Sequence, residues 1–189
     1  TKGMPGIDAI AGELAPAIEA ALKSLGLPAN NRVEEFLAAS DAVMNVSGDG
    51  TSYDSSKNDD DLVLGSKGAN SLSGKEGSDI LAGLRGADAL SGGAGADIFA
   101  FSALRDSRLR SPDRIVDFDI GSDRIALQAI GSLDFRAREG AEFSGAAEIR
   151  WYQDGGDTIV EIDANGDRSA DMQIVLEGSL TLEAADFLI

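Results

Sequence analysis

Oxygen-bearing side chains recur at a fixed spacing in the middle of the sequence. Residues 65–100 divide into four nine-residue lines, GSKGANSLS, GKEGSDILA, GLRGADALS and GGAGADIFA. The sixth position of these lines holds Asn70, Asp79, Asp88 and Asp97. One such oxygen per line, combined with backbone carbonyls, forms an oxygen-only ligand set that suits a hard cation. Calcium accepts six or more ligands in a flexible geometry, so it fits this set better than magnesium, which prefers a strict octahedron.

Glycine occupies the first and fourth positions of every line. The glycines are Gly65, Gly74, Gly83 and Gly92 at the first position and Gly68, Gly77, Gly86 and Gly95 at the fourth, with Gly93 added in the last line. Glycine permits positive φ and keeps side chains clear of a tight backbone, so the first six residues of each line predict a turn whose carbonyls can bind a cation. The eighth position holds Leu72, Leu81, Leu90 and Phe99. The last three residues therefore predict a very short strand with its central side chain inward and its neighbours facing the other way.

Two lines make one coil of eighteen residues, with a strand and a turn on each side. Sixth-position residues eighteen apart should then lie on the same edge of the stack. The predicted stacks are Asn70, Asp88 and Asp106 on one edge and Asp61, Asp79 and Asp97 on the other. Asp61 comes from a weaker line, SKNDDDLVL, and Asp106 keeps the spacing although its line lacks the glycines. Agreement of four columns over four lines disfavours the alternative, a glycine-rich linker with scattered acids.

Two further acidic clusters could bind cations. Residues 113–123 contain four aspartates, of which Asp123 is the candidate for an ion just beyond the last line; a simple turn acid is the alternative. Asp163 begins a stretch that resembles the start of an EF-hand loop, which requires glycine at its sixth position and glutamate at its twelfth. Those positions hold Arg168 and Ile174, so a hairpin turn is the better interpretation.

Composition restricts the classes of function. The 189 residues carry a net charge of −17, which argues against nucleic acid or an anionic membrane surface as partner. Cysteine and histidine are absent, so disulfides, thiolate metal sites and the commonest general base are excluded. The sequence contains no apolar run long enough for a membrane span and no basic-then-apolar signal peptide at its beginning.

The segments on either side of the lines have different periodicities. Residues 7–25 repeat apolar side chains at helical steps, with a kink expected at Pro16, and a second short helix is expected around Phe36. These helices would cap the open end of the stack or form a docking surface. Residues 41–58 predict a loop with weak repeat character. Beyond Ala100 the β-rich segments are 98–101, 114–118, 124–127, 149–152, 158–162 and 172–176.

The four lines resemble the RTX (repeats-in-toxin) nonapeptide GGxGxDxUx. The second half resembles the C-terminal region of serralysin-type (peptidase M10) proteases and other RTX proteins. The matching motifs are GADIFAF, DRIVDFDIGSDRIAL, GGDTIVEIDANGDRSADMQIVLEG and the ending LEAADFLI. The resemblance implies a mainly β fold: a parallel β-roll (an RTX nonapeptide solenoid) running into a C-terminal β-sandwich, preceded by a short α-helical N-terminal segment. The expected domains are residues 1–42, 43–105 and 106–189.

The resemblance further implies calcium (Ca2+) binding and recognition by a type I secretion exporter. The tail Asp186, Phe187, Leu188 and Ile189 is similar to the terminal signature of such export substrates, although Phe187 and Leu188 could equally form a last strand. The zinc-binding HExxH helix of serralysins has no counterpart, because this sequence has no histidine, so the chain is interpreted as non-catalytic.

The expected function is a calcium-binding export module of a secreted, extracellular bacterial protein without a cleavable N-terminal signal, unfolded inside the cell and folded outside. One alternative is a calcium-dependent module that binds polysaccharide or a cell surface, for which Trp151 and Tyr152 are the adjacent aromatic pair. Another is the accessory part of a secreted hydrolase whose catalytic domain lies upstream.

Overall fold

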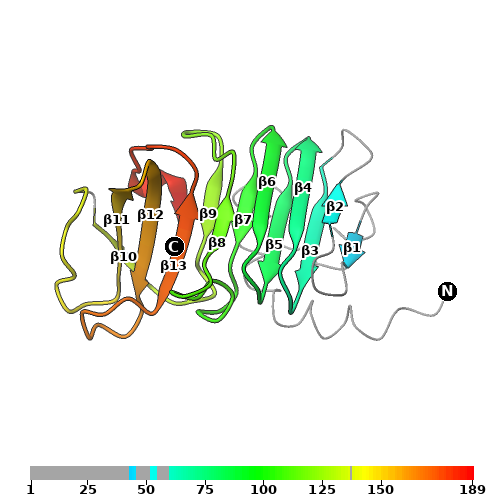
Figure 1. Ribbon diagram of the computed structural model, residues 1–189. Coiled ribbons are helices and arrows are strands. Elements are labelled where there is room, and N and C mark those ends of the chain that lie inside the picture. Colours follow the sequence, from blue (N-terminus) through cyan, green and yellow to red (C-terminus); the bar gives the residue numbers. More distant parts are fainter. Residues whose placement is uncertain (1–42, 46–51, 55–59, 137) are drawn as a thin grey trace.

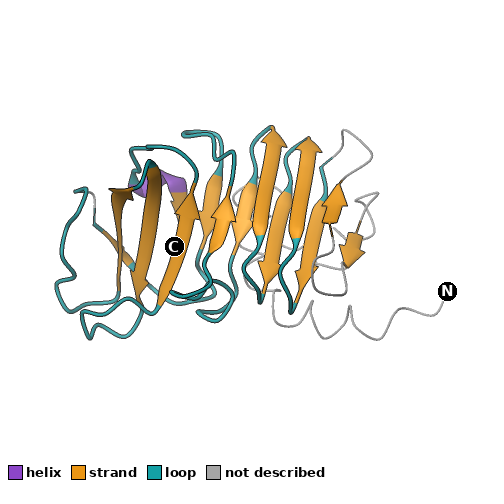
Figure 2. Ribbon diagram, viewed as in Figure 1, coloured by secondary structure: helices purple, strands orange, loops and turns teal. Residues whose placement is uncertain are grey.

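A computed structural model of the chain describes residues 43–45, 52–54, 60–136 and 138–189 (Figure 1). The helices expected between residues 1 and 42 lie outside the described residues. Two sheets form the body of the molecule, and the strands from β1 to β10 alternate between them (Figure 2). Among the described residues, no helix is long and apolar enough to cross a membrane.

The repeat region winds into a parallel β-roll. Its strands are β3 (Leu62–Ser66), β4 (Ser71–Glu76), β5 (Ile80–Leu84), β6 (Ala89–Ala94) and β7 (Ile98–Ala100). β3, β5 and β7 are neighbours in a six-stranded sheet, while β4 and β6 pair in an eight-stranded sheet. The parallel register places Leu62 beside Ile80 and Leu72 beside Leu90, an offset of eighteen residues in both sheets. The predicted eighteen-residue coil is confirmed.

The strands of the roll are longer than predicted. β4 does not end at Ser73, the last residue of its nine-residue line. It continues into the next line, where Lys75 pairs with Gly93 and Glu76 with Ala94. The first-position glycines therefore lie inside strands and not in turns. The ladder continues there because the neighbouring coil has a glycine at the equivalent place, so no side chain separates the two backbones.

A further coil precedes the recognisable repeats. β1 (Val43–Asn45) pairs in parallel with β3, and β2 (Ser52–Asp54) pairs in parallel with β4. The prediction of a loop over residues 41–58 was therefore wrong at these two segments. Residues of β1 and β2 pair with residues nineteen positions later, whereas the repeat has a spacing of eighteen. A search for exact nonapeptides therefore does not detect this coil.

The same two sheets continue into the second half of the chain. Its strands are β8 (Asp113–Ile115), β9 (Arg124–Ala126), β10 (Asp134–Phe135), β11 (Glu148–Asp154), β12 (Asp157–Asp163), β13 (Met172–Leu176) and β14 (Phe187–Leu188), with a short 3-10 helix, η1 (Ala184–Asp186). All six expected β segments contain a strand, and β10 was not expected. β14 pairs with β9, which confirms that Phe187 and Leu188 form a last strand.

Continuity of the sheets joins the roll to the sandwich. The eight-stranded sheet runs β10-β11-β12-β13-β8-β6-β4-β2, so β8 links the antiparallel strands of the second half to the parallel strands of the roll. β13 pairs with β8 in parallel, whereas β12 pairs antiparallel with both β11 and β13. The boundary at residue 105 thus remains a sequence prediction that coincides with no break in either sheet.

One hydrophobic core fills the space between the sheets. It contains the eighth-position side chains Leu72, Leu81, Leu90 and Phe99 together with Trp151 and the inner residues of β11 to β13. The outward neighbours on the six-stranded sheet, such as Ile80, are also buried, whereas Ser71 on the eight-stranded sheet is exposed. This difference explains why the lines end in SLS or ALS on the eight-stranded sheet and in ILA or IFA on the six-stranded sheet: a sheet buried on both faces requires apolar side chains on both.

Candidate metal centres

Buried aspartates form a hydrogen-bonded ladder along one edge of the roll. We call the side where the chain passes from the eight-stranded to the six-stranded sheet the second edge, and the opposite side the first edge. On the second edge the N–H of Asp61 donates to Asp79 Oδ1 at 2.7 Å, and the N–H of Asp79 donates to Asp97 Oδ1 at 2.8 Å. The N–H of Asp97 donates to Asp123 Oδ1 at 3.0 Å. The predicted stack is confirmed, and Asp123 continues it.

Asp123 also has the turn role that was its alternative interpretation. Its Oδ2 accepts the N–H of Asp119 at 2.9 Å, which closes the turn before β9. One carboxylate therefore both holds a local turn and fixes the neighbouring coil.

The first edge carries an equivalent ladder with one unexpected member. The N–H of Asn70 donates to Asp88 Oδ1 at 2.7 Å, and the N–H of Asp88 donates to Asp113 Oδ1 at 3.0 Å. Asp106 instead accepts the N–H groups of Ser102 and Ala103 within its own loop. The prediction that Asp106 follows Asp88 in the stack was wrong.

The correction has a structural reason. Leu90 pairs with Ile115, so the coil after β6 is longer than eighteen residues and counting by eighteen stops inside the inserted loop. A sequence signal could have found the right aspartate: the tripeptide Asp-Arg-Ile occurs at 113–115 and again at 123–125, each time entering a strand.

The second carboxylate oxygens of the ladder lack partners. The Oδ2 atoms of Asp79, Asp88, Asp97 and Asp113 are buried and accept no hydrogen bond from a described residue. A buried carboxylate with an unsatisfied oxygen is strongly unfavourable unless a cation or a proton neutralises it. This arrangement is therefore the main structural indication of a cation site.

Burial raises the pKa values of these carboxyl groups. Loss of hydration is the largest cause for all four, opposed by the main-chain hydrogen bond that each accepts and reinforced by neighbouring acids. The pKa of Asp79 rises to about 7, those of Asp88 and Asp97 to about 6, and that of Asp113 to about 9. Without a cation, the folded roll therefore binds protons at these aspartates more tightly than the unfolded chain does.

The glycines of the repeat leave space beside these carboxylates. A Cβ atom at Gly74, Gly83 or Gly92 would clash with the carboxylate five residues later in the same line. A Cβ at Gly65 would lie 2.8 Å from Oδ1 of Asn70. The first position must therefore be glycine for the sixth-position side chain to adopt its place.

The fourth-position glycines bring backbone carbonyls close to the next coil. A Cβ at Gly86 would lie 2.7 Å from the carbonyl oxygen of Gly68, and one at Gly95 would clash with the carbonyl oxygen of Gly77. Gly93, at φ +101°, has the same relation to the carbonyl of Lys75. Each turn thus combines one carboxylate with closely packed carbonyl oxygens.

This donor set fits calcium. Among the described residues there is no group of three or more His, Cys, Asp or Glu side chains arranged around one metal position. The oxygens that the turns bring together are carboxylates and backbone carbonyls, a set that calcium accepts and that zinc and other metals preferring nitrogen or sulfur do not.

Two other candidate sites do not have this character. Both oxygens of Asp163 are used, accepting the N–H of Gly166 at 2.7 Å and that of Arg168 at 2.8 Å, so the hairpin-turn interpretation is confirmed. Trp151 is buried in the core and Tyr152 is half-buried beside Glu161, so the pair forms no exposed aromatic platform.

Comparisons with known proteins agree with this architecture. A family model described as Peptidase M10 serralysin C terminal matches residues 40–189. No curated protein matches the sequence. The solved AlgE6R2 subunit of the Azotobacter vinelandii mannuronan C5-epimerase is 26% identical, with a TM-score of 0.50, over 80% of this chain and 95% of its own.

Two further solved structures are similar. The AlgE6R3 subunit of the same epimerase is 29% identical, with a TM-score of 0.44, over 75% of this chain and 84% of its own. The extracellular lipase LipA from Serratia marcescens is 21% identical, with a TM-score of 0.37, over 72% of this chain and 20% of its own.

Proposed function

This chain belongs to the Peptidase M10 serralysin C-terminal family, and we propose that it is an RTX module that binds calcium and folds when it does so outside the cell. The observation that carries the proposal is the set of buried Oδ2 atoms without hydrogen-bond partners on Asp79, Asp88, Asp97 and Asp113. Calcium bound beside them would supply the positive charge that this burial requires.

The proposed ligands come from the turns on both edges. On the second edge they are Asp61, Asp79, Asp97 and Asp123 with the carbonyls near Gly77 and Gly95. On the first edge they are Asn70, Asp88 and Asp113 with the carbonyls near Gly68 and Gly86. Asp106 serves here as a loop-capping residue next to the first-edge site, since Ser102 and Ala103 occupy one of its oxygens.

Calcium binding and folding are one equilibrium in this proposal. Without calcium the aspartates repel one another and lose hydration, and the thin coils bury too little apolar surface to offset the chain entropy. A calcium ion at one hundred times its dissociation constant adds about 2.7 kcal/mol per site to the stability of the folded state. The scarcity of calcium in the cytosol would keep the chain unfolded before export.

The test is a calcium titration of the whole chain followed by far-UV circular dichroism. We expect a cooperative gain of β signal at about 0.1 to 1 mM calcium, the range of extracellular calcium modules. Magnesium at the same concentrations should produce little change. A spectrum that is the same in chelator and in calcium would refute the linked folding.

Export by a type I exporter is the second part of the proposal. In the folded chain Asp186 is buried and accepts the N–H of Glu183 at 2.7 Å, and the ring of Phe187 lies 5.1 Å from that of Phe135. The tail would therefore be readable only before folding.

Deleting the last four residues and co-expressing the chain with a cognate exporter tests this role. We expect the truncated chain to stay in the cells. Secretion at the normal level would refute the signal and leave the tail with its structural role in β14.

The chain itself is proposed to be non-catalytic. The zinc chemistry of the serralysins requires histidine ligands, and this sequence contains none. The chain would then serve a catalytic domain elsewhere in a secreted protein. Mass spectrometry of the native secreted protein tests this: a mass near 19.5 kDa would contradict an attached catalytic domain.

A further inference from the structure

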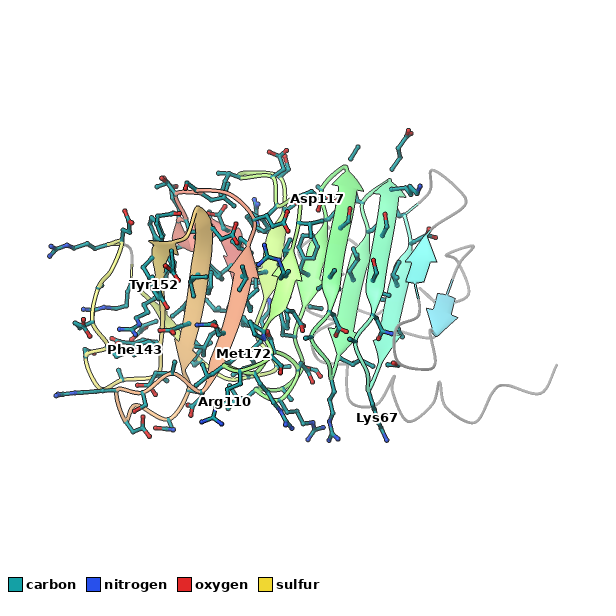
Figure 3. All side chains as sticks on the ribbon, viewed as in Figure 1. Lys67, Arg110, Asp117, Phe143, Tyr152 and Met172 are labelled. Carbon is teal, nitrogen blue, oxygen red and sulfur yellow. The ribbon has the colours of Figure 1, made fainter. Side chains whose placement is uncertain are left out.

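The first edge of the roll carries a row of exposed basic side chains on an otherwise acidic protein. The row consists of Lys67, Arg85, Arg105, Arg108 and Arg110, which are all exposed. Figure 3 shows Lys67 and Arg110 at the lower border of the molecule, pointing away from the sheets, with Asp117 at the opposite border. Five of the sixteen basic residues thus lie on one edge of a chain whose net charge is −17.

The roll sets the spacing of this basic row. Lys67 and Arg85 have the same position in lines eighteen residues apart, and Ser66 pairs with Leu84 just before them. They therefore lie on adjacent coils, about 4.8 Å apart along the stack. A bridge between Gly86 and Ser107 places the loop that carries Arg105 and Arg108 on the next coil. The row thus places basic residues on successive coils, whose backbones are roughly 5 Å apart.

A hollow lies among these side chains. Its volume is about 270 Å³, and its lining includes Lys67, Arg85, Arg105, Arg108 and the hydroxyl-bearing Ser111. Lys67, Arg85 and Arg108 form no salt bridge with any described residue.

The acids of the turns that carry the row are buried. Within residues 66–70, 84–88 and 101–112 they are Asp88 and Asp106. The exposed charged side chains of these three segments are therefore all basic, which fits an anionic ligand.

We propose that the basic row binds a linear acidic polysaccharide, specifically a polyuronate, which bears one carboxylate on each sugar. Single cations repeated along a shallow, open track match a polymer with regularly spaced single charges, and Ser111 adds a hydrogen-bonding group for sugar hydroxyls. The hollow adjoins the proposed first-edge calcium site, because Gly86 also lines it, whereas the carboxylates Asp88 and Asp113 of that site are buried.

Nucleic acid fits the same surface less well. Duplex DNA carries one charge per ~1.7 Å, which is much denser than the steps of roughly 5 Å between coils of the row. Recognition of single strands depends on exposed aromatic rings, and Phe101, the aromatic residue of this part of the first edge, is buried.

Calorimetry with the calcium-loaded full chain and a short oligogalacturonate tests the proposal, with circular dichroism of each sample to verify folding. We expect binding that weakens as salt increases and no binding of a neutral dextran oligomer of the same length. The variant Lys67→Gln/Arg85→Gln should bind about tenfold more weakly, because each exposed ion pair changes an affinity a few-fold. The matched control Lys75→Gln/Arg138→Gln removes the same charge outside the row and should bind normally.

Three results would overturn the proposal. They are equal binding of the neutral oligomer, unchanged affinity in the row variant, and tighter binding of a single-stranded oligonucleotide of equal charge, which would assign the row to nucleic acid. Because dichroism reports folding in the same samples, a failure of calcium-linked folding would be recognised separately from a failure of polysaccharide binding.

Discussion

Replacing Asp79 with asparagine should have opposite effects on the stability of the roll with and without calcium. Asp79 lies in the middle of the second-edge ladder, where it accepts the N–H of Asp61 and donates its own N–H to Asp97. Asn70, in the same position of its line, donates its N–H to Asp88 and accepts the N–H of Ser66 at its Oδ1, so this position accommodates an amide. The substitution keeps the shape of the side chain and removes its charge.

The magnitude follows from the raised pKa of Asp79. Burial raises it from 3.8 to about 7, so the folded state binds the proton more tightly than the unfolded chain. The resulting penalty is absent below pH 3.8, grows as pH rises, and reaches about 4 kcal/mol at pH 8. Asparagine avoids this penalty but buries an amide group without an acceptor, at a cost of about 2 kcal/mol. The net gain without calcium is then about 2 kcal/mol at pH 8 and near zero at pH 5.

Calcium should reverse the effect of Asp79→Asn on the stability of the folded state. The variant loses a charged ligand, so its calcium affinity should fall about tenfold or more, since affinity depends on the number of ligand charges. The calcium-loaded Asp79→Asn chain should therefore be less stable than the unmodified chain at pH 8.

Folding of both chains can be measured in chelator by titrating with trimethylamine oxide, which favours the folded state, and following far-UV circular dichroism. Asp154→Asn is the matched control, because it removes the charge of an exposed aspartate away from the ladder. The reasoning fails if the variant gains no stability at pH 8 in chelator, or if its gain is the same at pH 5.

Three further outcomes are expected. Asp113→Ala should weaken calcium binding more than Asp106→Ala in isothermal titration calorimetry, because Asp113 holds the ladder; the reverse order would restore Asp106 as the ladder residue. Gly74→Ala should destabilise the calcium-loaded fold in urea more than Gly131→Ala, because its Cβ overlaps the Asp79 carboxylate, whereas at Gly131 alanine meets nothing within 4 Å and adds only the backbone strain of φ +146°; a smaller loss at Gly74 would contradict close packing of glycine against the carboxylate. In chelator, folded signal should increase as pH falls from 9 to 5, because the raised aspartate pKa values make the folded state bind more protons, and a decrease would show that other groups dominate.

The sequence by itself determined the roll and most of its candidate ligands. Each line of nine is a complete local unit, with glycine where the backbone must pack closely and one apolar residue for the core, so four repeats define the coil without knowledge of distant contacts. The alternation of Asp79 and Asp88 between two edges follows from that coil alone. The DRIVDF and DRIAL segments and the hairpin around Asp163 were similarly readable from local β and turn patterns.

Tertiary structure decided every feature that depends on which segments become neighbours. Asp113 replaces Asp106 in the first-edge ladder because β8 pairs with β6 across an inserted loop. The nine-residue period does not predict the length of that loop. The coil formed by β1 and β2 was hidden for a related reason, since its register differs by one residue from the repeat.

The basic row illustrates the same limit at the surface. Lys67 and Arg85 are visibly periodic, but only the bridge between Gly86 and Ser107 brings Arg108 to the next coil. Local sequence specifies a turn because glycine and aspartate act through their own backbone and immediate neighbours. Which turns become neighbours is set by the pairing of strands that are far apart in the sequence. The free energy of that pairing depends on the whole sheet and its core and not on any one segment.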